Sequence, residues 1–564
     1  MKAIYFIFFC LLSCAISAQE TVQVGLLYND EAQTHPGYNL LYPHNQPDVW
    51  LMDNCGRVVH NWPGEEGSQP GNTAYIRENG DLLKTFRIGG GPNDPIWAGG
   101  AGQGIELRNW NNDLLWTYVL DDSTARLHHD IEPLPNGNVL AIAWEVMTQE
   151  EALAAGRRPD MLSDSVLWPE MILEIEPLTS EIVWEWHVRD HLIQDRDATL
   201  ENFGNVGQNP GRIDINYGLG SDGVADWLHA NALDYNAGLD QIVISIPRFD
   251  EIWIIDHSTT SAEAAGSTGG NAGRGGELLY RWGNPAAYRR GTPNNQQLFY
   301  QHDVQWTDDH LPESDPRYGM LTIFNNRLDG STRSAGQLLA PVFDTIAQVY
   351  EMIGNTFAPA AFEATYAHPE VNKTFSTGLS GIQPLPNGNT LICVGRTGLT
   401  FELNPAGEVV WEYKTPFNGG VRQPVETGLP LINNTTFRVP RYAEDYAGFV
   451  SRDLEPGDYL AFDDNALACQ TVGVEEEVDL DLAAPIILAP NPTTGIVTLT
   501  APMEWGSGPL RVTVYNALGR LVLKQCDDAS FFAGGQFQLD LSRLPGGIYV
   551  VAVEGRSVGR VVKR

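Results

Sequence analysis

The stretch Pro133-Leu134-Pro135-Asn136-Gly137-Asn138-Val139-Leu140 returns almost unchanged as Pro384-Leu385-Pro386-Asn387-Gly388-Asn389-Thr390-Leu391. Asn-Gly between two apolar runs favours a tight β-hairpin, because the turn needs positive φ at both central positions. A more divergent copy is Glu78-Asn79-Gly80-Asp81-Leu82-Leu83. Hairpins of one kind are therefore expected at widely separated places in the chain, which is typical of a repeated β architecture.

A second pattern, in which an apolar strand, a polar turn and another apolar strand end on an aromatic residue, occurs six times. We expect these segments to be outer hairpins, at residues 49–62, 104–116, 172–186, 252–282, 341–350 and 400–411. Apolar strands between them predict inner pairs, at 73–86, 128–145, 227–247, 301–325 and 379–395, with a sixth near 431–440.

Six such repeats without helical periodicity predict an all-β fold, a six-bladed β-propeller followed by a small C-terminal β-sandwich. No blade can bury both of its faces alone, so the repeats must pack against one another. The excess length lies in polar insertions, which we expect to form loops, near 147–168, 188–225, 258–276 and 327–375.

The composition excludes several classes of protein. Among 564 residues, 71 Asp and Glu stand against 35 Lys and Arg, which gives a net charge of −36. Because 43% of the residues are hydrophobic, the chain can fold despite this charge. An acidic surface opposes binding to phosphate backbones, so no nucleic acid partner is expected.

The two ends of the chain differ from the middle. Residues 1–18 have a basic start, a short apolar run and a small residue at Ala18, which predicts a cleaved signal peptide. Leu11-Leu12-Ser13-Cys14 also resembles a lipoprotein box. No other segment reaches 18 uninterrupted apolar residues, so no transmembrane segment is expected. We expect the propeller at 19–470 and a solvated acidic linker at 471–485.

Residues 486–564 read as a separate domain, since fourteen of the fifteen Trp residues precede residue 412. Its alternating apolar strands predict the β-sandwich. It closely resembles the type A sorting domain of the Bacteroidetes type IX secretion system, through Pro490-Asn491-Pro492-Thr493-Thr494-Gly495, Asn516-Ala517-Leu518-Gly519-Arg520 and Leu544-Pro545-Gly546-Gly547-Ile548-Tyr549. The resemblance implies translocation by that machinery across the outer membrane, then release or attachment to the cell surface.

Four cysteines remain after removal of a signal peptide: Cys55, Cys393, Cys469 and Cys526. Four cysteines allow three pairings. Because closure of a propeller ring brings the ends of the domain together, we predict a Cys55–Cys469 disulfide, with Cys393 as a small core residue. No Cys-x-x-Cys or histidine spacing typical of zinc is present, so no metal site is predicted.

Histidines stand near the starts of three predicted inner strands. They occur in His128-His129-Asp130, in Asp226-Trp227-Leu228-His229-Ala230-Asn231 and in Tyr300-Gln301-His302-Asp303. Ring closure would bring such equivalent positions together, so we predict that His129, His229 and His302 face one channel. The alternative is that each is a buried structural imidazole bonded to a neighbouring carbonyl.

The first 440 residues resemble the bacterial arylsulfotransferase family. The matching stretches are Trp227-Leu228-His229-Ala230-Asn231, Arg281-Trp282-Gly283-Asn284-Pro285, Gln301-His302-Asp303-Val304-Gln305-Trp306, Leu321-Thr322-Ile323-Phe324-Asn325-Asn326 and the closing stretch from Phe437 to Phe449. The resemblance implies a six-bladed propeller that transfers a sulfuryl group from an aryl sulfate to a phenol, without a nucleotide donor or another cofactor.

By motif, His229 and His302 match site histidines of the family, and its site arginine corresponds to Arg327 or Arg333. The family's nucleophilic histidine is missing, because Gly395-Arg396-Thr397 follows the strand where it would stand. His129 or upstream His368 would need another geometry to replace it, and Arg396 could bind an anion there or be a strand-end arginine. We predict that His302 is the nucleophile, with neighbouring Asp303 orienting or polarising the site.

Two other functions stay open on the sequence. One is a non-catalytic surface propeller that binds a sulfated or otherwise anionic ligand with the same histidines and arginines. The other is a sulfatase-like or other hydrolase. A histidine placed for in-line attack would favour transfer, whereas arginines and aromatics alone would favour binding.

Overall fold

A computed structural model describes residues 21–162, 164–218, 224–328, 330, 332–428, 430–462, 469, 487–500, 511–516, 521–526, 536–553 and 556–564. The predicted signal peptide and the whole of the predicted linker lie outside these residues. The chain divides into two compact units, Met1–Thr471 and Val472–Arg564, and each is described by itself.

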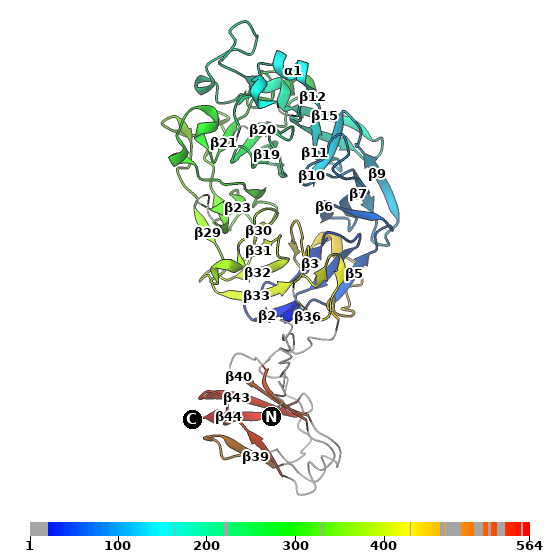
Figure 1. Ribbon diagram of the computed structural model, residues 1–564, viewed down its shortest axis with the longest axis vertical. Coiled ribbons are helices and arrows are strands. Elements are labelled where there is room, and N and C mark those ends of the chain that lie inside the picture. The colour runs from blue at the N-terminus through cyan, green and yellow to red at the C-terminus, as the bar shows by residue number, and fades with distance from the viewer. Residues whose placement is uncertain are drawn as a thin grey trace, which may run out of the picture. The chain divides into compact units, whose positions relative to one another are not determined.

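Six antiparallel sheets stand around a common centre in the first unit (Figure 1). With the strand nearest the centre first, blade 1 consists of β6 (Ser68–Ile76), β7 (Leu82–Ile88), β8 (Gly104–Arg108) and β9 (Leu114–Val119). Blade 2 consists of β10 (Ala125–Pro133), β11 (Val139–Glu145), β14 (Glu170–Glu176) and β15 (Glu181–His187). Blade 3 consists of β18 (Ala232–Asn236), β19 (Gln241–Ile246), β20 (Glu251–Asp256) and β21 (Tyr280–Trp282).

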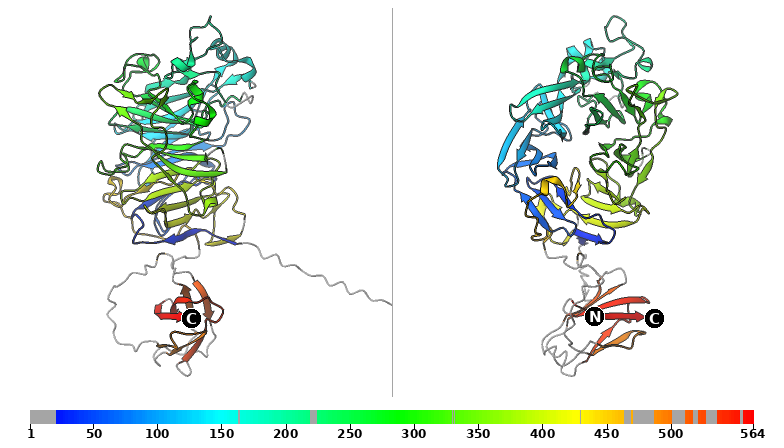
Figure 2. Two further views of the ribbon diagram at one scale, coloured as in Figure 1. Left: turned by 90° about the vertical axis from the view of Figure 1, so that its left-hand side faces the viewer. Right: turned by 180° about the vertical axis from the view of Figure 1, so that it is seen from behind.

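In the same order, blade 4 consists of β22 (His302–Trp306), β23 (Leu321–Leu328), β24 (Arg333–Leu339) and β29 (Ala364–Tyr366). Blade 5 consists of β30 (Gly381–Pro384), β31 (Thr390–Val394), β32 (Leu399–Leu403), β33 (Val409–Lys414) and β2 (Gly25–Asn29). Blade 6 consists of β37 (Arg441–Tyr442), β3 (Tyr38–Leu41), β4 (Val49–Asp53) and β5 (Val58–Trp62). The predicted six-bladed propeller is therefore confirmed (Figure 2).

The ring closes in two adjacent blades. In blade 5 the N-terminal strand β2 is added outside β33, and in blade 6 the late strand β37 pairs with the early strand β3. The sixth inner pair predicted near 431–440 is thus placed wrongly, because its two strands come from opposite ends of the domain. The outer hairpin predicted at 341–350 is wrong as well, since the outer strands of blade 4 are β24 and β29.

Short elements fill the insertions. They are two helices, α1 (Gln149–Ala154) and α2 (Ser261–Ala264), and six strand pairs: β1 (Thr21–Gln23) with β36 (Glu426–Gly428), β12 (Met147–Thr148) with β13 (Val166–Leu167), β16 (Leu192–Ile193) with β17 (Ile213–Asp214), β25 (Phe343–Asp344) with β26 (Val349–Tyr350), β27 (Met352–Ile353) with β28 (Thr356–Phe357) and β34 (Phe417–Asn418) with β35 (Val421–Arg422). Among the described residues, neither helix is long and apolar enough to cross a bilayer.

Apolar clusters fill the space between neighbouring blades, because each strand presents alternate residues to its two faces. Ile142 and Trp184 of blade 2, for example, pack with Leu233 and Trp253 of blade 3. Between blades 5 and 6, Trp411 packs with Trp50. Every blade is thus covered on both faces, and the ring holds its inner strands in fixed positions.

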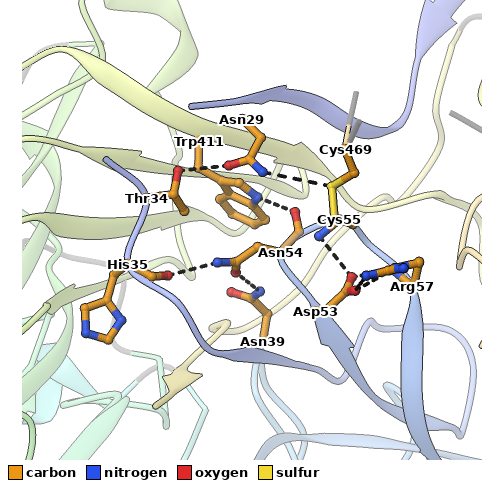
Figure 3. Close-up of a disulfide and its surroundings, with 10 residues drawn as sticks. All are labelled: Asn29, Thr34, His35, Asn39, Asp53, Asn54, Cys55, Arg57, Trp411 and Cys469. Carbon is orange, nitrogen blue, oxygen red and sulfur yellow. Dashed lines mark hydrogen bonds and ion pairs between the residues drawn. A yellow bond between two sulfur atoms is a disulfide. The ribbon is translucent and has the colours of Figure 1, made fainter. Parts of the chain in front are cut away.

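A disulfide joins Cys55 to Cys469, with a Cα–Cα distance of 5.5 Å. Cys55 lies in the turn between β4 and β5, and Cys469 follows the last propeller strand (Figure 3). Beside it, the Trp411 indole N–H donates to the Asn54 carbonyl at 2.7 Å and ties blade 5 to the same turn. Cys393 is a free, buried cysteine.

The second unit is a small β-sandwich. One sheet contains β38 (Ile487–Ala489), β39 (Ile496–Thr500) and β42 (Gln536–Asp540); the other contains β40 (Arg511–Asn516), β41 (Leu521–Cys526), β43 (Gly547–Val553) and β44 (Arg556–Lys563). Val497 and Leu539 of the first sheet form one buried cluster with Val514 and Val551 of the second. The described residues thus agree with the predicted sandwich.

Candidate active site

Inner strands of the propeller carry irregular backbone where they begin. At this end His129 lies in a bulge of β10, His229 comes just before β18, and His302 is the first residue of β22. His129, His229 and Tyr300 have φ of 52°, 58° and 56°, in the left-handed region that such residues rarely adopt. Strained backbone of this kind clusters at functional sites and turns side chains away from the sheet.

The three histidines predicted to face one channel lie together. The rings of His129 and His229 are 4.7 Å apart between centroids. The Phe437 ring, which comes just before the inner strand of blade 6, is 6.3 Å from His129 and 6.5 Å from His302. We call this place, where the inner strands of blades 2 to 4 begin, the histidine end of the propeller.

His302 has a defined orientation. Its Nδ1 lies 2.8 Å from Asn326 Oδ1, and the Asn326 amide donates to the carbonyls of Ser376 and Leu379 at 3.0 Å each. Because these two bonds occupy the amide NH₂, Asn326 must present its oxygen to His302 and accept a hydrogen bond from Nδ1–H. The lone pair is then on Nε2. Burial lowers the pKa of His302 to about 3, so the ring is neutral at ordinary pH.

His229 is held by a carboxylate. Its Nδ1 lies 2.6 Å from Asp226 Oδ2, and Arg248 Nη2 lies 3.3 Å from the same oxygen. Although burial acts in the opposite direction, the charge of His229 and its hydrogen bond lower the pKa of Asp226. An ionised Asp226 can stabilise a positive charge on the His229 imidazole.

A chain of three groups ends at His129. Glu170 Oε2 lies 2.8 Å from His128 Nε2, and His128 Nδ1 lies 2.8 Å from His129 Nδ1. Burial raises the pKa of Glu170 well above its usual value and lowers the pKa of both histidines well below theirs. The chain is therefore neutral as a whole, and it can pass a proton from a buried carboxyl to the ring of His129.

The three predicted arginines differ in their distance from the histidines. A methyl group built on Gly378 would lie 3.3 Å from Arg396 Nη2 and 3.7 Å from His302 Cε1, so Arg396 and His302 flank the same glycine. Arg327 stacks at 4.4 Å on Tyr300, whose ring is 6.1 Å from that of His302. Arg333 is at the start of β24, and all three arginines are exposed. Arg396, predicted separately as an anion-binding residue, thus lies beside His302, whereas the prediction of Arg327 or Arg333 as the family's site arginine stays open.

Two predicted roles change. The carboxylate of Asp303 forms an ion pair of 3.0 Å with Arg438, on the side away from the histidines, so Asn326 and not Asp303 orients His302. His368 lies near outer strands of blade 5, with Nε2 3.5 Å from Glu412 Oε2 and its ring against Phe401. It is therefore separate from the histidine end.

His44 is an imidazole near Arg396 that the sequence analysis did not consider. It follows the second strand of blade 6, as Arg396 follows the second strand of blade 5. Its Nε2 is buried and has no hydrogen-bond partner among the described residues. Burial, together with the charges of Arg87 and Arg396, lowers the pKa of His44 to about 4. No motif surrounds His44, and its equivalence to Arg396 emerges only when the ring is closed.

A cavity of about 580 Å³ lies toward the other end of the inner strands, and residues from all six blades line it. Arg438 separates it from the histidines: its guanidinium bonds to Asp130 at 2.7 Å and also contacts Tyr75, while the preceding Phe437 faces His129. Neighbouring residues of an extended segment point to opposite sides, so Phe437 faces the histidines while Arg438 lines the cavity.

Comparison with known proteins gives two family matches. Residues 41–416 match the arylsulfotransferase (ASST) family, and residues 488–564 match the secretion system C-terminal sorting domain. No curated protein matches the chain. The sorting domain directs the protein through the type IX system across the outer membrane, to the cell surface or the medium.

Several solved structures are similar at low identity. A protein of unknown function from Bacteroides caccae is 12% identical, with 72% of this chain and 100% of that one covered and a TM-score of 0.37. A catalytically inactive virginiamycin B lyase from Staphylococcus aureus is 10% identical, with coverage of 70% and 89% and a TM-score of 0.31. The Cps50 (Swd1) β-propeller domain of Myceliophteria thermophila is 10% identical, with coverage of 71% and 90% and a TM-score of 0.31.

The matched family region covers most of the propeller, from β3 to the end of blade 5, and includes His129, His229, His302 and Arg396. The chain belongs to the arylsulfotransferase family and carries a type IX sorting domain at its C-terminus.

Proposed function

We propose that the protein transfers a sulfuryl group from an aryl sulfate to a phenolic acceptor, without a nucleotide donor, through a covalent intermediate on His302. The observation that carries the proposal is the bond between His302 Nδ1 and Asn326 Oδ1, because it leaves the Nε2 lone pair available beside Arg396 and the other histidines. Family membership supports the substrate class.

In the first step His302 Nε2 attacks sulfur, an N–S bond forms, and the S–O bond to the aryl group breaks with its electrons going to the phenolate. A proton from the Glu170–His128–His129 chain neutralises the departing phenolate. The Arg396 guanidinium and the His229 imidazole stabilise the negative charge on the sulfuryl oxygens.

In the second step the acceptor phenol returns its proton to the same chain as its oxygen attacks sulfur. The new S–O bond forms while the N–S bond breaks, which restores the lone pair of His302. No proton or electron is gained or lost over the cycle. The neutral state of His128 and His129 suits this use, because each can both accept and return a proton.

Binding without turnover is the second candidate function. It is favoured by one specific observation, the presence of Arg396 where the sequence resemblance leads us to expect a nucleophilic histidine. A guanidinium binds sulfate through charge and hydrogen bonds but does not form the covalent intermediate.

The test uses the purified mature chain with 4-nitrophenyl sulfate, with and without excess phenol. We expect release of 4-nitrophenol that depends on phenol, loss of at least 1,000-fold in kcat for His302→Ala, and mainly a higher KM for Arg396→Ala. His368→Ala is the matched control, since this histidine lies apart from the site and should retain activity.

The other outcomes separate the alternatives. Release without dependence on phenol would indicate a hydrolase. Saturable binding of 4-nitrophenyl sulfate without any release, lost in Arg396→Ala, would support the binding propeller and contradict transfer.

A further inference from the structure

Three carboxylates meet away from the histidine end, and two of them, Glu132 and Asp234, are buried while Asp309 is exposed. Glu132, Asp234 and Asp309 each offer an oxygen, and these oxygens all lie within 4.8 Å of one another. Glu132 is near the end of β10, Asp234 is in the middle of β18, and Asp309 follows β22. Each therefore comes from the same segment as one of the three site histidines, but three to seven residues further along the chain.

The side chain of Glu132 gives a second, independent reason to consider a ligand. It is 8% exposed and, among the described residues, has no hydrogen bond or ion pair. A buried carboxylate is costly unless a cation or hydrogen-bond donors surround it. Glu132 points instead toward two further carboxylates, and it lines the wall of the 580 Å³ cavity.

The positive groups of this cavity are engaged elsewhere. Arg438 bonds to Asp130 and Asp303, and Arg441 pairs with Glu402. Arg77, which also lines the cavity, donates to the Gly137 carbonyl at 3.3 Å. In the described part of the chain, no Lys or Arg forms an ion pair with any of the three carboxylates. Repulsion between carboxylates this close together is large in a buried site. Glu78, also in the cavity wall, adds negative charge nearby.

We propose that Glu132, Asp234 and Asp309 form a calcium site that is distinct from the histidine end. A set of carboxylate oxygens without nitrogen or sulfur suits a hard divalent cation. Oxygens that all lie within 4.8 Å of one another can share one ion. Ca²⁺ tolerates flexible geometry with Ca–O distances of about 2.3–2.6 Å, whereas Mg²⁺ demands a near-ideal octahedron. The cavity leaves room for the water molecules that would complete the coordination.

Such an ion would join blades 2, 3 and 4 through their inner strands. These strands also carry His129, His229 and His302, so calcium would fix the relative positions of the segments from which the histidines project. The ion would not touch the histidines, because Arg438 and its two carboxylate partners lie between the cavity and the histidine end. The proposal therefore concerns the stability of the ring and is independent of the proposed sulfuryl transfer.

The test is calorimetric titration of EDTA-treated mature protein with calcium chloride, together with thermal unfolding. We expect one Ca²⁺ per chain and a higher Tm in calcium. Glu132→Gln keeps the shape of the side chain and should raise the Kd at least tenfold and remove the calcium-dependent shift in Tm. Glu78→Gln is the matched control, because it removes the same charge from the same cavity without removing one of the three ligands.

Three results would overturn the proposal. The first is the absence of any calcium-dependent heat or Tm shift in the wild type, which would mean that shared protons hold the carboxyls together. The second is calcium binding that is unchanged in Glu132→Gln. The third is equal weakening of binding in Glu78→Gln, which would mean diffuse attraction of calcium to an acidic protein.

If Glu132→Gln fails to fold, terbium provides a second measurement on the wild type and on Asp234→Asn. Trp306 lines the cavity, and its backbone N–H donates to Asp234 at 2.5 Å. Terbium bound at the site should therefore emit on excitation of tryptophan. Calcium should displace it, and Asp234→Asn should lose the emission. Absence of sensitised emission in the wild type would contradict the site.

Discussion

The tautomer of a single imidazole decides what the histidine end can do. His302 has its lone pair on Nε2 because Nδ1–H donates a hydrogen bond to Asn326. Asn326 has that orientation because two backbone carbonyls hold its NH₂ group. In the proposed transfer Asn326 is therefore a positioning residue, which would act on the reaction through His302.

Asn326→Ala should lower kcat about 10- to 100-fold and leave KM within about threefold, because the ring of His302 loses its fixed tautomer while Arg396 still binds sulfate. Asn325→Ala is the matched control: this neighbouring amide is equally buried but bonds to Phe299, Gln297 and Gln337. Both variants should lose stability, and only Asn326→Ala should lose kcat. Equal effects on kcat would mean that Asn326 has a merely structural role.

The pH dependence of the rate should follow the lowered pKa of His302. With a pKa of about 3 the nucleophile stays neutral at pH 5, so kcat/KM should change less than about threefold between pH 7 and 5. For an imidazole with the usual pKa of about 6.5, the neutral fraction, and with it kcat/KM, would fall about 25-fold over this range. A fall of that size in kcat/KM for 4-nitrophenyl sulfate would contradict the assignment.

Stability changes in the same pH range and must be measured beside the rate. The folded pKa of His302 is below that of the unfolded chain, so the unfolded chain binds more protons between the two values. The stability is fully present above about pH 6.5 and declines as the pH falls toward 3, by about 1.4 kcal/mol per pH unit for each such group. Far-UV circular dichroism at each pH identifies any loss of folded protein.

At the scale of elements, the sequence predicted most blades because Asn-Gly turns and alternating strands are local signals. It failed in blade 4, where the hairpin-like segment at 341–350 contains the small pair β25 and β26 inside an insertion. The true fourth strand, Ala364–Tyr366, has only three residues and none of them is fully buried, so it carries no apolar pattern.

The candidate site, like the blades, was predictable where the signal is local in the sequence. His129, His229 and His302 follow from their common position in successive repeats, which is local information. The partner of His302 does not follow from local information, because Asn326 reaches His302 across the β22–β23 pair. Asp303, although adjacent to His302 in sequence, faces Arg438. His44 needed the closed ring, since the rest of its blade is completed by β37, from the other end of the domain.

The segment between β7 and β8 supports the site through Gly100, whose φ is +80°. Its carbonyl accepts hydrogen bonds from the backbone N–H of His129 and from Asn72. A Cβ at this position would lie 2.0 Å from His129 Nε2, so the ring would have to move. The close approach of this segment to β10 thus fixes the position of the imidazole.

Gly100→Ala should lower kcat/KM at least tenfold and destabilise the fold by more than about 1 kcal/mol. Gly67→Ala is the matched control, because Gly67 has φ +85° and no heavy atom within 4 Å of a built Cβ. It should show the backbone cost alone, with activity within threefold of the wild type. Similar losses of activity in both variants would show that backbone strain, and not His129, is responsible.

For the whole molecule, the Cys55–Cys469 disulfide closes a sequence separation of 414 residues. In the chain-entropy model a cross-link of this kind raises the free energy of unfolding by more than about 4 kcal/mol. Part of the same constraint already comes from the β2–β33 and β3–β37 pairs, which also join the ends of the ring. The observed contribution should therefore be nearer the typical 2–4 kcal/mol.

Cys55→Ala should lower the free energy of unfolding by about 2–4 kcal/mol in urea titrations, and dithiothreitol should have no further effect on it. Wild type treated with dithiothreitol should behave like the variant. Cys393→Ala is the control, since it removes a free buried thiol and leaves the cross-link, so its response to dithiothreitol should remain. A wild type that does not respond to reduction would contradict a stabilising role.

Closure of the ring in two blades also imposes an order on biosynthesis. The strands β2 and β3 are among the first to leave the ribosome, yet their partners lie at residues 409–414 and 441–442, close to the end of the domain. Blades 1 to 4 can form as each is completed, whereas blades 5 and 6 must wait for nearly the whole domain. A chain that terminates before residue 409 retains two early strands with open hydrogen-bonding edges, and such edges promote aggregation and proteolysis. Premature termination therefore yields a substrate for degradation and not a smaller propeller.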